Sequence, residues 1–401
     1  MARAPPWASE CPARHITSEG TTLNDSTSSR PGRGRGIAAA IAGAVLISLV
    51  ALQPAAADAR TPDARTADTP AAASAAAGGT TASPAEIARA DTYWTKERMA
   101  AATPELPPDV GERALADALA DAEAANALPA RSAPGATPRH ATTATGTDTT
   151  ATDVTDTIGT AAVTQAQRWG GQGQMPATTT GKVYFTRGDG SGGFCSGSVV
   201  TAANNNTVWT AGHCIHPGGT GPGTYHTNIV FVPDADNGLE PHGQWSYKFA
   251  NTTIGWQDNG DFAYDLAAIA VWPQGSRGDL AGWVGSQGYA FGSGQTWASL
   301  HALGFPAAGY QRGDFSGNDL WFCEGPSTAA GSDIRMTCDM RNGTSGGPWL
   351  DDLQTARGWG YIVGAYSYHY LDGNGNYADQ FMYSANHGDG AINVYNDVSV
   401  R

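Results

Sequence analysis

Three short sequences in the second half of the chain contain residue types that together can do nucleophilic chemistry. His213 lies in the sequence TAGHC, Asp265 opens the sequence DLAAI, and Ser345 lies in the sequence GTSGGP. A serine hydroxyl becomes a strong nucleophile when an imidazole accepts its proton and a buried carboxylate holds that imidazole in the correct tautomer. We therefore predict that Ser345 attacks a carbonyl carbon, that His213 transfers the proton and that Asp265 orients His213.

Each of these sequences has an ordinary structural interpretation when it is taken alone. A histidine beside a cysteine is usually a packed residue, and a serine among glycines usually belongs to a turn. Their joint occurrence in the order His, Asp, Ser arises by chance far more rarely than any one of them. Asp261 lies four positions before Asp265, but its Gly-Asp sequence is typical of a turn, so we assign the orienting role to Asp265.

The same motifs resemble those of the chymotrypsin-like serine peptidases over about residues 181–394. The run from CSG, which begins at Cys195, to TAGHC is similar to the secreted bacterial branch that includes glutamyl-endopeptidase-like enzymes. This resemblance implies an all-β fold of two packed six-stranded antiparallel β-barrels, with the triad in the cleft between them. It also implies peptide-bond hydrolysis through an acyl-enzyme on Ser345, with an oxyanion hole formed by the backbone N–H groups of Gly343 and Ser345.

The cysteines fit the same resemblance. It implies a disulfide between Cys195 and Cys214, and Cys323 and Cys338 then remain to pair with each other, although four cysteines allow three connectivities. In the chain-entropy description, each closed loop contributes about 3 kcal/mol to stability.

Two residues are candidates for the selectivity of the pocket beside Ser345. Asp339 lies six positions before the serine, where trypsin-like members carry the acid that binds Lys or Arg, but Arg341 replaces a cysteine that those members carry nearby. His369 lies on the expected pocket wall, and a histidine in that region helps to hold an acidic side chain in glutamyl endopeptidases. Ser367 is predicted to contact the substrate backbone. The sequence leaves a preference for a basic or an acidic residue open.

The strands that must position these residues are short apolar runs between turns rich in Gly, Asn, Asp and Pro. The sequence DGNGN at 372–376 has oxygen atoms at alternate positions, but Tyr377 and Tyr383 stand where an EF-hand loop needs Gly and Glu. We predict a β-turn there, and no metal or other cofactor. The expected strands are residues 181–186, 198–200, 207–210, 229–232, 266–271 and 360–366.

The start of the chain has the features of a secretory signal. Arginines precede an apolar run at 37–52, and small residues follow it. We predict a signal peptide with an extended N-region over residues 1–57. The alternative is a retained membrane anchor, for which the run is short. Cleavage removes Cys11 and leaves an even number of cysteines, which suits an oxidising compartment.

Residues 58–160 are rich in Ala, Thr, Pro and Asp, and residues 109–128 have the composition of a helix. We predict a propeptide and low-complexity linker there, with some helix followed by a disordered stretch; the alternative is a spacer without a folding role. Residues 161–401 are the expected peptidase domain. Thr344 stands where most digestive-type members carry an Asp that pairs with the new N-terminus, so activation of this zymogen is expected to depend on release or degradation of the propeptide.

The composition of the whole chain limits its partners. It has 401 residues and a formal net charge of −14 at pH 7, which argues against nucleic acid because phosphate binding needs a basic surface. The leading hypothesis is a secreted, extracellular, monomeric serine endopeptidase that acts on proteins or peptides, without stable membrane association after processing. A catalytically silent binding module on the same fold is the alternative. A serine esterase of the α/β-hydrolase type needs the order Ser, Asp, His, which this chain lacks.

Overall fold

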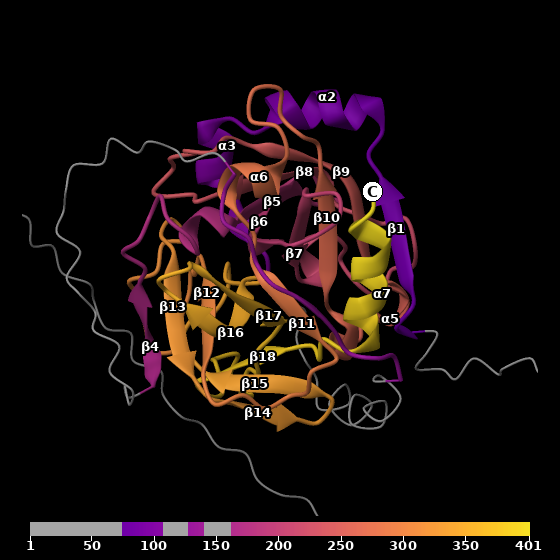
Figure 1. Cartoon of the computed structure of the whole chain (residues 1–401). Coiled ribbons are helices and arrows are strands. Elements are labelled where there is room, and N and C mark those ends of the chain that lie inside the picture. The colour runs from indigo at the N-terminus through magenta and orange to yellow at the C-terminus, as the bar shows by residue number, and fades with distance from the viewer. Residues whose placement is uncertain (1–73, 107–126, 140–161) are drawn as a thin grey trace, which may run out of the picture. The chain divides into compact units, whose positions relative to one another are not determined.

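The computed structural model describes residues 74–106, 127–139 and 162–401. These residues form mostly strands, with a few short helices at turns and one helix at the C-terminal end (Figure 1). All six predicted strands are present. The predicted signal peptide and most of the predicted helix at 109–128 lie outside the described residues. In the described part of the chain, no helix is long and apolar enough to cross a membrane.

The first half of residues 162–401 is a closed antiparallel barrel of six strands. They pair in the order β9-β10-β7-β6-β5-β8, and β8 also pairs with β9, which closes the ring. Alternate residues, such as Val183 and Phe185 of β5, fill the interior, as the two-residue period of a strand requires. The strands are β5 Thr180–Thr186, β6 Gly192–Val200, β7 Thr207–Thr210, β8 Thr227–Pro233, β9 Trp245–Thr253 and β10 Ala267–Val271.

The second half consists of two sheets that share one core. A seven-stranded sheet has the order β3-β11-β17-β16-β12-β13-β4, and a three-stranded sheet has the order β14-β15-β18. The edge strand β3 comes from upstream residues 131–133 and pairs with β11. Trp349 from the first sheet and Met336 and Met382 from the second belong to one buried cluster. The strands are β3 Arg131–Ala133, β4 Val163–Arg168, β11 Gly288–Phe291, β12 Leu300–Gly304, β13 Trp321–Gly325, β14 Ser327–Ala330, β15 Asp333–Thr337, β16 Pro348–Gln354, β17 Trp359–Ala365 and β18 Phe381–Ser384. The predicted all-β fold class is confirmed, with one closed six-stranded barrel in the first half and two sheets around one core in the second.

Short helices connect the strands, and their ends are capped. The hydroxyl of Thr253 accepts a hydrogen bond from the N–H of Trp256 at the start of α5, and Gly260 ends that helix in the left-handed conformation. The C-terminal helix α7 packs its buried face, including Val394 and Val398, against β9 and β10. The helices are α5 Ile254–Asn259, α6 Leu280–Val284 and α7 Asp389–Val398, with 3₁₀ turns η1 Ala177–Thr179, η2 Gly212–Cys214 and η3 Phe262–Tyr264.

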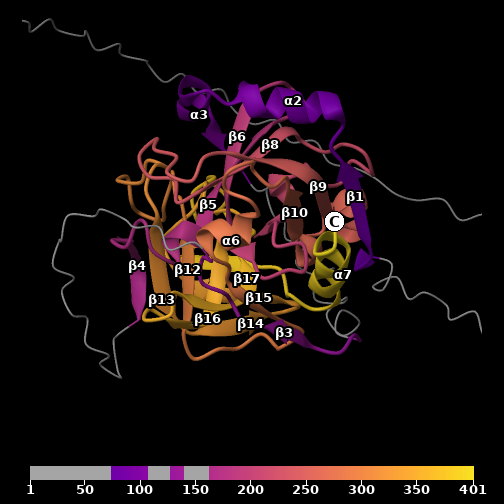
Figure 2. The same cartoon turned by 45° about the horizontal axis from the view of Figure 1, so that its top comes forward.

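The segment 74–106, upstream of the barrel, contains ordered elements that composition did not predict. β1 extends the barrel sheet by pairing antiparallel with β9, and β2 pairs parallel with β6. Figures 1 and 2 both show these indigo elements along the barrel strands. Helix α2 begins with a capping box between Ser83 and Glu86. The elements are β1 Ala77–Thr81, α2 Pro84–Tyr93, α3 Lys96–Ala101 and β2 Thr103–Pro104.

Candidate active site

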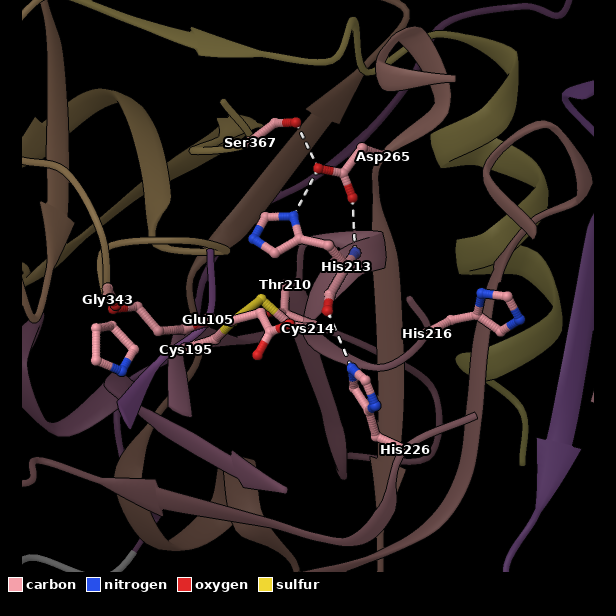
Figure 3. Close-up of a disulfide and its surroundings, with 12 residues drawn as sticks. Glu105, Cys195, Thr210, His213, Cys214, His216, His226, Asp265, Gly343 and Ser367 are labelled. Carbon is pink, nitrogen blue, oxygen red and sulfur yellow. Dashed lines mark hydrogen bonds and ion pairs between the residues drawn. A yellow bond between two sulfur atoms is a disulfide. The ribbon is translucent and has the colours of Figure 1, made fainter. Parts of the chain in front are cut away.

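His213 and Asp265 form a buried, doubly hydrogen-bonded pair. His213 lies in η2, directly after β7, and Asp265 lies at the end of η3, just before β10. The Nδ1 atom of His213 is 2.7 Å from Oδ2 of Asp265, and the backbone N–H of His213 donates to Oδ1 at 2.7 Å (Figure 3). Ser367 also donates its hydroxyl to Oδ2. The ring therefore has one orientation, and its Nε2 atom faces away from the carboxylate.

The local sequence explains why this carboxylate can approach so closely. A β-carbon at Gly212 would lie 2.8 Å from Oδ1 of Asp265, so the glycine before His213 leaves room for the acid. The competing acid Asp261 instead caps η3 by accepting a hydrogen bond from the N–H of Ala263 at 3.0 Å. The structure thus pairs Asp265 with the histidine and uses Asp261 in a turn.

The charge of Asp265 controls the acidity of the histidine. Burial by itself lowers the pKa of His213, because a low dielectric disfavours the imidazolium. The carboxylate of Asp265 opposes this effect through its charge and its hydrogen bond, and the charge of Glu105 acts in the same direction. The net result is a pKa above the ordinary value of 6.5.

Ser345 lies in a tight turn before β16, and this turn packs against β6 and against β7, the strand that leads to His213. The N–H of Ser196 donates to the carbonyl of Ser345 at 2.7 Å. At the next residue, Gly346, a β-carbon would lie 2.0 Å from Oγ1 of Thr210, so only glycine permits this contact. Among the described residues, neither Oγ of Ser345 nor Nε2 of His213 has a hydrogen-bond partner. Both side chains have the hydrogen-bonding capacity that the predicted proton transfer needs.

The turn before Ser345 presents two backbone N–H groups without acceptors. Gly343 has a φ of +94°, and a β-carbon there would lie 2.5 Å from the carbonyl oxygen of Phe305. The N–H groups of Thr344 and Gly346 donate to other backbone carbonyls. Within the described ranges, no acceptor bonds the N–H groups of Gly343 or Ser345. These are the two groups that were predicted to form the oxyanion hole.

The carboxylate of Asp339 is hydrogen-bonded to β4 and to Arg312. Its Oδ1 atom accepts from the N–H of Ala166 in β4 at 2.8 Å, and its Oδ2 atom accepts from Arg312 at 3.1 Å. The residue is buried, with 2% exposure. Both carboxylate oxygens therefore have partners within the protein.

His369 lies in a buried polar cluster with Arg341, a residue that was not predicted to belong to the site. The Nδ1 atom of His369 is 2.6 Å from the hydroxyl of Tyr366, and its ring packs edge-on against Tyr377. Burial, followed by the charges of Arg341 and His213, lowers the pKa of His369 to about 3. Arg341 is fully buried and donates to the carbonyls of residues 338, 340 and 379. No carboxylate of the described residues forms an ion pair with it.

The two predicted disulfides are present. Cys195 bonds to Cys214 and Cys323 bonds to Cys338. The first connects β6 to the residue that follows His213, and the second connects β13 to the residue that precedes Asp339. Two groups of side chains in the described residues lie close enough to hold a metal, but both consist largely of these disulfide sulfurs, which are not thiolates.

No profile of a known protein family matches this chain. The crystal structure of the protease Anisep from Arthrobacter nicotinovorans is 33% identical, with a TM-score of 0.50, and the match covers 59% of this chain and 100% of that one. The chain belongs to the chymotrypsin-like serine peptidase family. It is therefore a protease with an all-β fold.

Two further proteins are similar to this chain. The thermostable serine protease AL20 from an extremophilic microorganism is 31% identical over 56% of this chain and 98% of its own, with a TM-score of 0.49. A segment of 91 residues is 34% identical to the extracellular metalloprotease of Bacillus subtilis (strain 168). That match covers 23% of this chain and 26% of the relative, so the chain spans about a quarter of that protein.

Proposed function

We propose that this chymotrypsin-like peptidase is a secreted serine endopeptidase that hydrolyses proteins or peptides through an acyl-enzyme on Ser345. The observation that carries the proposal is the buried pair of His213 and Asp265 beside the serine turn. The carboxylate of Asp265 bonds both the Nδ1 atom and the backbone N–H of His213, so the free Nε2 atom faces away from the carboxylate and can act as a base. A nucleophile activated in this way attacks acyl carbons.

The mechanism assigns one role to each group. His213 takes the proton of Ser345 as its Oγ attacks the peptide carbonyl, and the same proton is then given to the leaving amine. Asp265 keeps the imidazole oriented and stabilises its charged form, and Ser367 helps to hold Asp265. The N–H groups of Gly343 and Ser345 stabilise the oxyanion. Water then repeats the sequence on the acyl-enzyme and releases the acid.

The residue before the cleaved bond is proposed to be acidic. Arg341 is a fully buried cation without an ion-pair partner in the described chain, four positions before Ser345, and such a charge favours an anionic ligand. His369 lies in the same cluster and can donate a hydrogen bond. Asp339 is the competing candidate, but Arg312 and the N–H of Ala166 already occupy its carboxylate. This arrangement supports a role for Asp339 in holding β4.

The enzyme is further proposed to be an extracellular monomer that is made as a zymogen. The two disulfides suit an oxidising compartment. Residues 1–57 would be the signal peptide and residues 58–160 the propeptide, whose removal would leave the domain 161–401. The burial of Ser345 and His213 in the full chain, at 0% and 1% exposure, supports a precursor that must open before it binds substrate.

A fluorophosphonate probe tests the proposal, because it reacts with activated serines. We expect covalent labelling at Ser345 in the processed protein and none in Ser345→Ala. In peptide hydrolysis, Ser345→Ala should lower kcat by about 10⁶, since the members of a triad act as a unit. A well-folded Ser345→Ala protein with normal hydrolysis would reject the mechanism. The residue before each cut in a mixed peptide library then reports the primary specificity.

A further inference from the structure

Arg187 contacts the upstream segment with most of its hydrogen-bond donors. Its Nε atom donates to the carboxylate of Glu105. Its Nη1 atom donates to the hydroxyl of Thr103 at 3.2 Å, and its Nη2 atom donates to the carbonyls of Thr103 and Pro104, both at 3.3 Å. In the described part of the chain, Glu105 is the carboxylate that forms an ion pair with Arg187. One guanidinium thus binds an acidic side chain and the backbone that precedes it.

The hairpin between β5 and β6 holds Arg187 ready for these contacts. The backbone N–H of Arg187 donates to the carbonyl of Ser191 at 2.9 Å. Its Nη1 atom also donates to the hydroxyl of Ser191 at 3.2 Å and to the carbonyl of Gly192 at 3.0 Å. A guanidinium whose position is set by its own hairpin loses little freedom when it binds a carboxylate.

The bound glutamate lies beside the proposed catalytic residues. The N–H of Glu105 donates to the carbonyl of Phe194 at 2.9 Å, one residue before the Cys195–Cys214 disulfide. The ring of Phe194 lies next to Gly343, where a β-carbon would meet it at 2.9 Å. Figure 3 shows Glu105 near the disulfide, between Gly343 and His213. The charge of Glu105 is also near enough to contribute to the raised pKa of His213.

The segment that carries Glu105 packs on the surface of the barrel through a buried side chain and a short strand. Trp94 inserts into the barrel surface, donates its indole N–H to the carbonyl of Asn228 at 2.7 Å and packs against Tyr184. Residues 103–104 then run along β6 toward the site. Ser345 is inaccessible in this arrangement, whereas a peptide carbonyl must touch its hydroxyl during catalysis.

We propose that Arg187 forms a subsite for an acidic side chain next to Ser345, and that Glu105 occupies this subsite and blocks the site until the segment leaves. The proposal rests on the serine endopeptidase function proposed above and adds a second point of recognition to it. Once the segment leaves, a glutamate or aspartate near the cleaved bond of a substrate takes the place of Glu105. Arg187 donates from Nε to the carboxylate and from Nη2 to the backbone before it, and a lysine could not make both contacts in this fixed geometry.

The first experiment measures the rate at which the fluorophosphonate probe labels Ser345 in the full chain. Glu105→Gln and Arg187→Gln should each label about tenfold faster than the unmodified chain, because each leaves the other partner of a largely buried ion pair unpaired. The double variant should label no faster than the faster single variant, since both act through one contact. Arg357→Gln, which breaks the remote pair with Asp352, is the matched control and should not change the rate.

The second experiment tests the subsite with substrates. In the Glu105→Gln chain, peptides with Glu at one position near the cut should be cleaved faster than peptides with Gln or Lys there. Adding Arg187→Glu should reverse this preference toward Lys. Melting temperatures of all variants identify any that do not fold.

The outcomes separate the two proposals. If no preparation is labelled at Ser345, even after the upstream segment has been removed by limited proteolysis, the proposed function fails. If labelling and hydrolysis occur but the Glu105 and Arg187 variants behave like Arg357→Gln, the function stands and the subsite is rejected. An unchanged peptide preference in Arg187→Glu also rejects it.

Discussion

His213 is held at its ring and at both of its backbone groups, so its chemistry depends on its partners. Besides the two bonds to Asp265, its carbonyl accepts from Nε2 of His226 at 3.3 Å (Figure 3). Only the neutral imidazole can take the proton of Ser345. We therefore expect kcat/KM to fall as the pH decreases through the pKa of His213, which lies above 6.5.

The variant Asp265→Asn tests the origin of that pKa. It removes the charge that raises the pKa of His213, so the acidic limb of the pH–rate profile should move to lower pH. The rate itself should drop by about 10⁴, because the amide favours the wrong tautomer of the ring. Profiles of kcat/KM measured on the processed enzyme report both effects. Asp261→Asn is the control, since Asn can still cap η3, and an equal loss of rate in that variant would contradict the assignment.

The backbone at Gly343 leads to a second prediction at the scale of single residues. Gly343→Ala places a β-carbon against the carbonyl of Phe305 in a strained conformation. The loop must shift, so kcat should fall by about 10² to 10³ with a smaller change in KM, because an oxyanion donor acts in the transition state. Gly373→Ala is the matched control: no atom lies within 4 Å of a β-carbon there. Equal kinetics for the two variants would exclude Gly343 from the oxyanion hole.

At the scale of elements, β15 carries a buried acid that should make stability depend on pH. Burial raises the pKa of Asp333 to about 7, against the opposing hydrogen bonds from Tyr368 and Ser332. The folded state therefore holds a proton that the unfolded state releases near its ordinary pKa of 3.8. The contribution of Asp333 to the free energy of unfolding therefore decreases as the pH rises from about 4 to about 7. Above about pH 7 this contribution no longer changes.

Asp333→Asn removes the free-energy cost of ionising a buried carboxyl and keeps an acceptor for the hydroxyl of Tyr368. At about pH 8 the variant should be more stable by about 1 to 3 kcal/mol, and at about pH 4 the difference should vanish. Chemical denaturation at both pH values measures the change. A variant that is less stable at both would show that Asp333 is charged and stabilising in the fold.

The sequence predicted the barrel strands well and the upstream elements poorly, for a physical reason. Runs such as residues 181–186 and 266–271 alternate or concentrate apolar side chains, and their burial is what forms the strand. The strand β1 has the sequence AGGTT, which has no such pattern, because backbone hydrogen bonds to the edge of β9 hold it. The capping box at Ser83 and Glu86 was a readable signal for α2.

The sequence likewise predicted one part of the candidate site and missed another. The motifs around His213, Asp265 and Ser345 could be recognised because their chemistry needs fixed neighbours, including glycines that allow close approach. The contact between Arg187 and Glu105 joins residues 82 positions apart and leaves no local pattern. Arg341 was noted as the replacement of a cysteine, but its burial and its hydrogen bonds to the carbonyls of residues 338, 340 and 379 depend on tertiary packing.

At the scale of the whole molecule, the question is whether segment 74–106 and the barrel unfold as one unit. β9 pairs with β8 and β10 as well as with β1, so the ring stays closed without the segment. The segment depends on fewer anchors, of which Trp94 is the largest buried side chain, at 4% exposure. Stability should therefore be lowest in the segment, and local release should be possible without global unfolding.

Trp94→Ala in the full chain tests this arrangement. Removing the indole deletes the hydrogen bond to Asn228 and a large packed surface, a loss of about 3 to 5 kcal/mol for a buried tryptophan. Hydrogen exchange should accelerate in β1 and α2 while β5, β6 and β7 keep their protection, and the probe should label Ser345 faster. Trp272→Ala, at a position that is 38% exposed, is the control and should change neither. Simultaneous loss of protection in the barrel strands would mean that the segment is part of one cooperative fold, because its anchor would then support the barrel as well as cover the site.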